Sequence, residues 1–275
     1  MIDRFVLVIG AMKAGTTTLF QLLRQHPRIA ACREKEPNFL SEPERWRQGL
    51  AAYEQLWDWR PEQHTWALEA STSYTKLPMR RSASSATWTL PAEFRFVYLV
   101  RHPIARLRSE YLHSLAKGWL AKPIYEGLAP HSVLHSNYRM QLAPYIAAHG
   151  TQAVLVLSYG ELCRDPLAVT RRVWGWLGLD ASAPVRDPGP QNSSDGHRAR
   201  WMDKCLERCN GDARAAAAEF ERGIAPSPEQ VRRIHELLDV DLALFRDQWG
   251  IDPWAETERS RSTSGSNSAV EALMG

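Results

Sequence analysis

Glycines, a lysine and three threonines lie close together in IGAMKAGTTTLF, residues 9–20. The segment follows an apolar run and precedes a helix-like stretch, so it would form a turn between a strand and a helix. Such a turn directs backbone N–H groups and the positive helix end at one point, where an anion binds. Gly10 and Gly15 let the backbone turn. Lys13 lies inside the loop, whereas nucleotide hydrolases have it directly after the second glycine. A tight turn alone needs no lysine or threonines, so we predict an anion site.

A second set of cationic and hydroxyl side chains follows the apolar run RFVYLV, residues 95–100. Arg101 ends this expected strand, and Ser109 comes two helical turns later in RHPIARLRSEY. A guanidinium fork and a hydroxyl can bind a phosphate together, and Arg106 and Arg108 would add positive potential. Taken alone, this pattern is more typical of a solvated basic helix start. Combined with the first loop, it predicts a ligand with two separated anionic groups.

The end of the same expected strand argues against a metal site. P-loop phosphoryl transfer uses magnesium that is held partly by an acidic residue at a neighbouring strand end, where this chain has Arg101. The next apolar strand offers only Glu161, which lies beyond the strand end. Cys205 and Cys209 are four residues apart without additional Cys or His ligands, which favours two neighbours on a helix. We therefore predict no metal site.

The elements that must position these side chains alternate between β-branched apolar runs and amphipathic segments, as in a parallel α/β sheet. Strands are expected at 4–9, 66–71, 95–100 and 153–158, and helices at 16–25, 103–117 and 165 to about 177. A long loop at 182–196 and two helical stretches follow. We predict one α/β domain over residues 1–255, with a P-loop-like central parallel sheet flanked by helices. Its carboxyl-terminal portion, from about residue 198, would be helical, and residues 256–275 a disordered tail.

Composition is typical of a globular protein, with 44% hydrophobic and 24% charged residues. The formal net charge of +3, from 34 basic and 31 acidic residues, is too small to indicate a nucleic-acid partner. Apolar runs are far shorter than the ~20 residues of a membrane-spanning helix. We therefore expect no membrane span and a cytoplasmic protein, a compartment that the four cysteines also fit.

Together, the two anion-binding segments resemble those of the sulfotransferases that use 3′-phosphoadenosine 5′-phosphosulfate (PAPS). In that family, a segment like IGAMKAGTTTL binds the 5′-phosphosulfate, and one like YLVRHPIARLRSEY binds the 3′-phosphate. The displaced lysine is the family's own arrangement. The resemblance covers roughly residues 2–179, including LLRQHPRIAA, REKEPNFL, LEASTSY and VLVLSYGELCRDPLAVTRRVWGWLGL. It is most similar to the branch of heparan-type carbohydrate sulfotransferases and their bacterial relatives.

The resemblance implies PAPS as the donor and 3′,5′-adenosine bisphosphate as the product. Lys13 would contact the oxygen that bridges phosphate and sulfate, and Arg101 and Ser109 would bind the 3′-phosphate. The 5′-phosphate would be bound by Ala14, Gly15, Thr16, Thr17 and Thr18. The segment SSDGHRARW, residues 193–201, would close the nucleotide site as a loop. His197 and Arg198 are candidate ligands there, and a plain solvated loop is an equal alternative.

The general base implied by the resemblance is Glu36, at the start of EPNFL. Glu34 is the competing candidate, and without the family match an ion pair of Glu36 with Lys35 or Arg33 would be the simpler explanation. Glu69 and Tyr74 of LEASTSY would lie on the acceptor side. Many family members have a lysine directly after this glutamate, and this chain has alanine there, so acceptor identity does not transfer from the heparan enzymes.

The expected activity is metal-independent, in-line transfer of a sulfuryl group from PAPS to a hydroxyl, or an amine, of a small-molecule or glycan acceptor. A P-loop small-molecule kinase is one alternative, which the missing strand-end acid disfavours. A non-catalytic nucleotide-binding module on the same fold is the other. Both phosphate-binding segments and a candidate base are present, which favours the enzyme.

Overall fold

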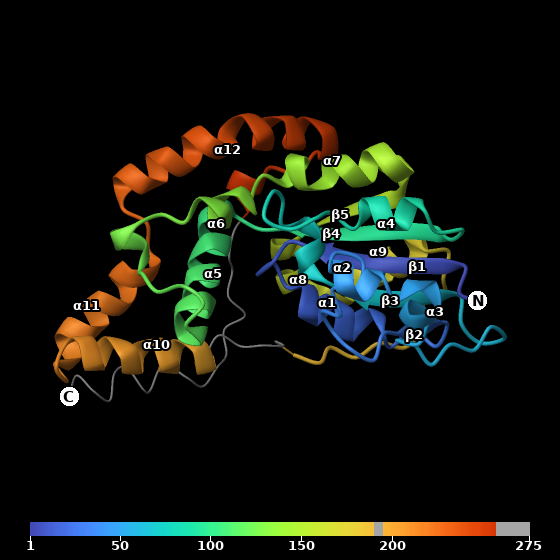
Figure 1. Ribbon diagram of the computed structural model, residues 1–275, viewed down its shortest axis with the longest axis horizontal. Helices are drawn as coiled ribbons and strands as arrows, with labels where there is room; N and C mark the ends of the chain where they lie inside the picture. Colours follow the sequence, from blue (N-terminus) through green and yellow to red (C-terminus); the bar gives the residue numbers. More distant parts are fainter. Residues whose placement is uncertain (190–194, 257–275) are drawn as a thin grey trace.

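The fold is built on a central sheet of five parallel strands (Figure 1). The computed structural model describes residues 1–189 and 195–256. The strand order is β2-β3-β1-β4-β5. The strands are β1 (Arg4–Gly10), β2 (Ile29–Ala31), β3 (Trp66–Ala70), β4 (Glu93–Val100) and β5 (Val154–Ser158). The predicted α/β fold with a parallel sheet is confirmed. The short β2, at the edge of the sheet, was not predicted.

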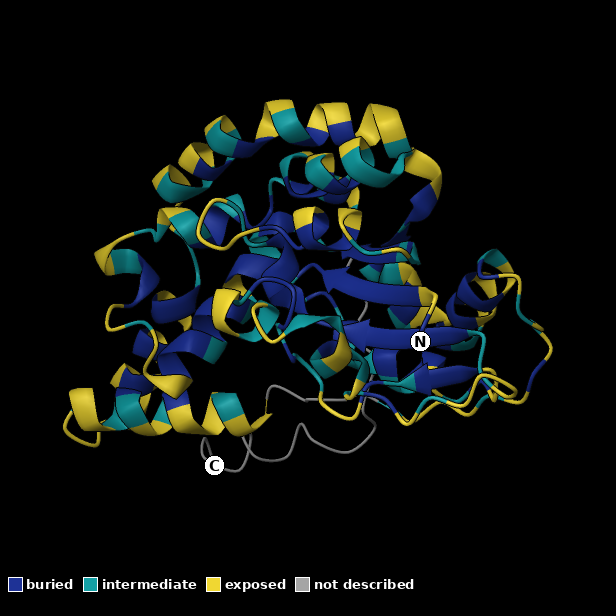
Figure 2. Cartoon of the chain, turned by 45° about the vertical axis from the view of Figure 1, so that its right-hand side comes forward, coloured by how far each residue is buried: buried dark blue, intermediate teal, exposed yellow. Residues whose placement is uncertain are grey.

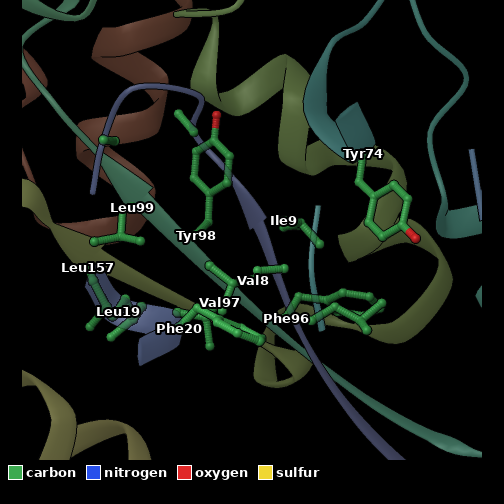
Figure 3. Close-up of a cluster of buried hydrophobic side chains, with 14 of the residues drawn as sticks. Val8, Ile9, Leu19, Phe20, Tyr74, Phe96, Val97, Tyr98, Leu99 and Leu157 are labelled. Carbon is green, nitrogen blue, oxygen red and sulfur yellow. The ribbon is translucent and has the colours of Figure 1, made fainter. Parts of the chain in front are cut away.

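Helices cover both faces of the sheet, which explains why β1 after Arg4 and β4 after Arg95 are continuous apolar, buried runs. Figure 3 shows Leu19 and Phe20 of α1 (Thr16–Leu23) on one side of β4, and the Tyr98 ring on the other. Tyr98 packs edge-on against Tyr138 of α7 (Tyr138–His149), with 5.9 Å between ring centroids. Alternate side chains of one strand therefore enter two separate parts of the core.

The remaining helices connect the strands or follow them. Helix α5 (Pro103–Lys117) follows β4, and α9 (Pro166–Trp176) begins at the cap predicted for it, because the Asp165 side chain accepts a hydrogen bond from Ala168 N at 2.9 Å. The other connecting helices are α2 (Pro43–Trp46), α3 (Gly49–Glu54), α4 (Ser84–Trp88), α6 (Pro130–Leu134) and α8 (Tyr159–Arg164). Single 3-10 turns are η1 (Thr72–Thr75), η2 (Ile124–Glu126), η3 (Thr151–Ala153) and η4 (Pro253–Ala255).

The carboxyl-terminal portion is helical, as predicted, but contains three helices where the sequence indicated two. They are α10 (Asp195–Arg208), α11 (Ala213–Ile224) and α12 (Pro228–Trp249). Side-chain caps separate them, with Asp212 accepting from Ala215 N at 2.9 Å and Ser227 forming a capping box with Gln230. Helices α10 and α11 lie beside α5, and α12 beside α7 (Figure 1). Figure 2 shows that α12 alternates between buried and exposed residues, so one face packs on the domain.

Two sequence expectations concern segments beyond the described residues. The predicted tail at 256–275 falls there except for Glu256, and so do residues 190–194 of the predicted surface loop. Among the described helices, none is long and apolar enough to cross a membrane.

Candidate active site

The loop after β1 is shaped by two glycines at points of close approach. Gly15 precedes α1 with φ 86°, and a Cβ there would lie 3.0 Å from Leu162 Cδ2. A Cβ at Gly10 would lie 2.3 Å from Thr75 Oγ1. Only glycine fits these positions without displacing a neighbour. The first-turn N–H groups of α1, which begins at Thr16, have no acceptor within the helix and are suited to an anion.

Lys13 and Arg101 connect the two predicted phosphate sites. Arg101 follows β4, which lies next to β1, and its Nη1 donates a hydrogen bond to the Lys13 backbone oxygen at 2.7 Å. Its guanidinium also lies 4.7 Å from the Tyr159 ring centroid. Lys13 has a left-handed backbone, with φ 68°. Burial and the nearby Arg101 charge lower the pKa of the Lys13 ammonium. The structure therefore brings together two cations from segments 88 residues apart.

The helix after Arg101 carries Ser109 on its second turn, where the side chain is half-buried. Arg106 and Arg108, which lie between Arg101 and Ser109 in the sequence, do not add positive potential to the site as predicted. Arg106 is fully buried, and its Nη1 donates to Glu110 Oε2 at 2.6 Å. Burial raises the pKa of Glu110, but Arg106 and His135 outweigh it and lower that pKa to about 2. Arg108 forms an exposed ion pair with Glu221 at 3.0 Å. Arg106 thus holds α5 in place.

The Glu36 carboxylate is held at the end of β3. Its Oε2 accepts from Thr72 N at 2.7 Å and from Thr72 Oγ1 at 3.2 Å, and its Oε1 accepts from Lys35 Nζ at 2.8 Å. Its backbone N donates to Ala70 O at 2.9 Å, and φ is 61°. Because β3 pairs with β1, Glu36 and the Lys13 loop lie at the same edge of the sheet. The expected ion pair with Lys35 is present together with the contacts to Thr72.

Glu34, the competing candidate base, is placed differently. Its side chain is 56% exposed and forms an ion pair with Arg45 at 3.3 Å. Glu36, in contrast, is held by Asn38, whose Nδ2 donates to Glu36 O at 2.9 Å. Asn38 itself has a left-handed backbone, with φ 54°. The geometry thus favours Glu36 over Glu34. Sequence reasoning missed Thr72 and Asn38, and the only signal for Asn38 was that asparagine tolerates a left-handed backbone.

Glu69 and Tyr74, expected on the acceptor side, are both fully buried. The Glu69 carboxylate accepts hydrogen bonds from Tyr53 Oη and from Ser71 Oγ, the latter at 2.6 Å. The Tyr74 hydroxyl accepts from Leu40 N at 3.2 Å. Burial raises the pKa of the Glu69 carboxyl. The Tyr74 hydroxyl thus contacts the segment that follows Glu36, and Glu69 contacts Ser71, whose Oγ accepts from Asn38 N at 3.1 Å. The expected place of both residues on the acceptor side stays a prediction.

His197 and Arg198 belong to the start of α10 instead of a loop. His197 Nε2 lies 3.1 Å from His113 Nδ1 of α5, and burial followed by the Lys13 charge lowers the pKa of both imidazoles, that of His113 to about 4. His197 is therefore near the Lys13 loop. The Arg198 guanidinium lies 4.9 Å from the Phe220 ring centroid of α11, so it packs on another helix. His113, one turn after Ser109, was missed because a histidine inside a helix carries no motif of its own.

The predicted absence of a metal site remains a prediction. Within residues 1–189 and 195–256, no three His, Cys, Asp or Glu side chains gather in a way that could hold a metal ion. Glu161, the late strand-end acid, faces Arg172 at 3.5 Å. All four cysteines are free. Cys205 is buried in the last turn of α10, and Cys209 directly follows the helix, with its backbone N donating to Cys205 O at 3.0 Å.

The family model of the sulfotransferase domain matches residues 3–208, which is most of the chain. The chain belongs to the sulfotransferase family. The family predicted from the two phosphate-binding segments is thereby confirmed, and membership supports PAPS as the donor.

Among known sulfotransferases, the chain is 27% identical over 185 residues to heparan sulfate glucosamine 3-O-sulfotransferase 3A1 of Mus musculus. It is 28% identical over 183 residues to heparan sulfate glucosamine 3-O-sulfotransferase 6 of Homo sapiens. Each match covers 63% of this chain, but 45% and 52% of the respective relative, so the chain spans about half the length of the curated relatives it matches. A sulfotransferase crystal structure from Alicyclobacillus acidocaldarius matches in fold, with a TM-score of 0.57 and 22% identity over 84% of this chain and 100% of that one.

Proposed function

We propose that the protein is a PAPS-dependent sulfotransferase that transfers the sulfuryl group to an acceptor hydroxyl, or to an amine. The observation that carries the proposal is the 2.7 Å hydrogen bond from Arg101 Nη1 to Lys13 O. It joins two cationic sites that suit a ligand with separate 3′- and 5′-anionic groups, and PAPS is such a ligand. A nucleotide with a single phosphate group would use only one of these sites.

The proposed roles follow from chemistry and position. PAPS supplies the sulfuryl group when bound. The Lys13 ammonium stabilises the negative charge that develops on the 5′-phosphate oxygen as the bond to sulfur breaks. Residues 14–18, which form the end of the loop and the first turn of α1, donate hydrogen bonds to that phosphate, while Arg101 and Ser109 bind the 3′-phosphate. Among the other sequence candidates, His197 would lie near the nucleotide, whereas Arg198 is engaged with α11.

Glu36 is the proposed general base. Its carboxylate accepts the acceptor proton as the acceptor oxygen attacks sulfur. The two Thr72 donors and Lys35 fix its orientation, so the base is positioned before the acceptor arrives. The mechanism is proposed to be metal-independent, because Arg101 provides positive charge at the strand end where phosphoryl-transfer enzymes bind magnesium through an acid.

A glycan is the leading acceptor class, because the relatives above are heparan sulfate glucosamine 3-O-sulfotransferases by name. A small-molecule acceptor is the alternative. We also propose that the protein is cytoplasmic, since its four cysteines are free, as reduced thiols are in that compartment.

The test compares Glu36→Gln with Glu34→Gln, which removes a nearby exposed carboxylate as a matched control. Turnover is followed by transfer of labelled sulfate from PAPS to a set of glycan and small-molecule acceptors. Binding of 3′,5′-adenosine bisphosphate is measured by calorimetry. We expect Glu36→Gln to retain bisphosphate binding and lose turnover by at least ~100-fold, while Glu34→Gln retains both. Near-normal turnover of Glu36→Gln would assign the base to another residue.

A further inference from the structure

A short segment after α12, residues 252–256, lies against the carboxyl ends of β4 and β5, and we term it the strap. The chain turns back toward the sheet after α12 (Figure 1). The Trp254 ring stacks on His235 of α12, with 4.1 Å between ring centroids and an interplanar angle of 18°. The same ring lies edge-on to His102, the N-cap residue of α5, at 5.4 Å. The Asp252 side chain caps the turn by accepting from Trp254 N at 3.0 Å. The strap therefore joins α12 to the start of α5.

The Glu256 carboxylate of the strap contacts the residues on both sides of Tyr159. Its Oε2 accepts from Ser158 Oγ at 2.6 Å and from Gly160 N at 3.1 Å. Ser158 is buried at the end of β5, and its Oγ also accepts from Glu161 N at 3.0 Å as the cap of α8. Hydrogen bonds to an ionised carboxylate are stronger than those to a neutral acceptor. The backbone around Tyr159 is therefore tied to the strap.

The Tyr159 ring lies between the two proposed phosphate sites. On one side, the Arg101 guanidinium is 4.7 Å from the ring centroid. On the other, a Cβ at Gly15 would lie 3.1 Å from both Cδ2 and Cε2 of the ring, so the ring packs directly on that glycine. Gly15 precedes α1, whose first turn is proposed to bind the 5′-phosphate. One aromatic ring thus separates the cation of the 3′-phosphate site from the backbone of the 5′-phosphate site.

The position of this ring decides how the two sites are held relative to each other. A tyrosine side chain occupies a few staggered rotamers, so a fixed backbone at Tyr159 restricts where its ring can lie. The face of the ring attracts the Arg101 guanidinium and thereby orients it. A nucleotide that carries both phosphates must meet both sites at once, and it binds best when they are held in place beforehand. A nucleotide with the 5′-phosphate alone does not depend on this spacing.

We propose that Glu256 is a positioning residue of the nucleotide site. Its carboxylate holds residues 158–160, these hold the Tyr159 ring, and the ring sets the Arg101 guanidinium for the 3′-phosphate. This inference rests on the proposed function and adds to it a residue that comes after all of the nucleotide-binding residues in the sequence. Glu256 contacts neither the nucleotide nor the acceptor in this role, and it exchanges no proton with them.

The test compares calorimetric affinities for 3′,5′-adenosine bisphosphate and for 5′-AMP. Glu256→Ala removes the acceptor of both hydrogen bonds, whereas Glu256→Gln keeps an amide oxygen in its place. Asp247→Ala is the matched control, because Asp247 forms an exposed ion pair with Arg246 at 3.4 Å. We expect Glu256→Ala to reduce the preference for the bisphosphate about three- to tenfold, since the effect passes through Tyr159 and is smaller than the loss of a direct contact to the phosphate. Glu256→Gln and Asp247→Ala should keep most of the preference.

A double-mutant cycle tests the route through Tyr159. Tyr159→Leu removes the ring that packs on Arg101 and Gly15. If Glu256 acts through this ring, Tyr159→Leu combined with Glu256→Ala should show the same ligand preference as Tyr159→Leu alone. A purely structural role of Glu256 would instead lower the unfolding temperature and both affinities without changing their ratio.

Three outcomes would overturn the inference. One is an unchanged ratio of the two affinities in Glu256→Ala. Another is an equal change in Glu256→Ala and Glu256→Gln, which would indicate an effect of charge instead of hydrogen bonding. The third is additivity of the effects of Tyr159→Leu and Glu256→Ala.

The parent protein separates failure of the inference from failure of the proposed function. If the parent bound the bisphosphate and 5′-AMP equally, the proposed 3′-phosphate site would fail together with the inference. If the parent preferred the bisphosphate and Glu256→Ala did so equally well, only the inference would fail.

Discussion

Arg101→Met removes the guanidinium that joins the two proposed phosphate sites while keeping much of the side-chain volume. Arg101 has two separable roles. It donates to Lys13 O at 2.7 Å, which fixes the loop, and it is proposed to bind the 3′-phosphate. The first role affects every nucleotide that uses the loop. The second affects only nucleotides that carry a 3′-phosphate.

The size of each effect follows from the kind of bond that is lost. A hydrogen bond to a charged group contributes about 1.5–3 kcal/mol, and 1.4 kcal/mol corresponds to tenfold in affinity. Loss of the contact to the 3′-phosphate should therefore weaken binding of 3′,5′-adenosine bisphosphate by about 10- to 150-fold. Loss of the contact to Lys13 O weakens the bisphosphate and 5′-AMP equally. The ratio of the two affinities thus isolates the 3′-phosphate term.

The assay is calorimetry with 3′,5′-adenosine bisphosphate and 5′-AMP on the parent protein and on Arg101→Met. Arg108→Met is the matched control, since Arg108 forms an exposed ion pair with Glu221 at 3.0 Å. We expect the parent to prefer the bisphosphate and Arg101→Met to lose that preference, while Arg108→Met keeps it. Equal affinity of the parent for both ligands, or a loss in Arg101→Met that is the same for both, would refute the assignment of the 3′-phosphate to Arg101 and Ser109.

Two further predictions concern helix α5. Glu110→Ala should lower the free energy of unfolding by about 3–5 kcal/mol because it leaves Arg106 buried and unpaired, whereas Arg106→Met combined with Glu110→Leu should lose much less. Urea unfolding measures both, and equal losses would contradict the prediction. The pKa of His113 is lowered to about 4 by burial and then by Lys13, so the unfolded chain gains a proton as the pH falls through 6.5 before the folded chain does. The free energy of unfolding should therefore fall as the pH is lowered from 6.5 to 4. In His113→Asn, urea unfolding midpoints should change less over this range, and an unchanged pH dependence would contradict the assignment to His113.

The sheet and the phosphate-binding loop could be predicted because their signals are local. The strand RFVLVI, residues 4–9, and the loop that ends at Gly15 each carry their signal in a few consecutive residues. Arg101 could be assigned to the same ligand as that loop from its residue type and its place at a strand end, whereas the pairing of β1 with β4 comes from the structure. A three-residue strand such as β2 has no comparable signal, since its pairing with β3 decides its structure.

The surroundings of the site depend on tertiary contacts and could not be predicted in the same way. Arg106 lies in a basic run, and only the fold shows that it turns inward to Glu110. Glu69 was expected on the acceptor side, and only the fold shows that it is fully buried on β3, a strand that is covered on both faces. His197 was expected in a loop, and it lies on a helix that packs against His113. Each outcome depended on what an element packs against.

Three non-glycine residues at the candidate site have a left-handed backbone: Lys13, Glu36 and Asn38, with φ of 68°, 61° and 54°. Glycine or asparagine is the usual residue in this region, and each other side chain there costs about 1–3 kcal/mol. Lys13 and Glu36 are the two residues proposed to act on the departing oxygen and on the acceptor proton. Neither role can be performed by glycine. A purely structural turn would favour glycine at these positions. A lysine and a glutamate that are kept there in spite of the backbone cost are expected where their side chains are needed for function.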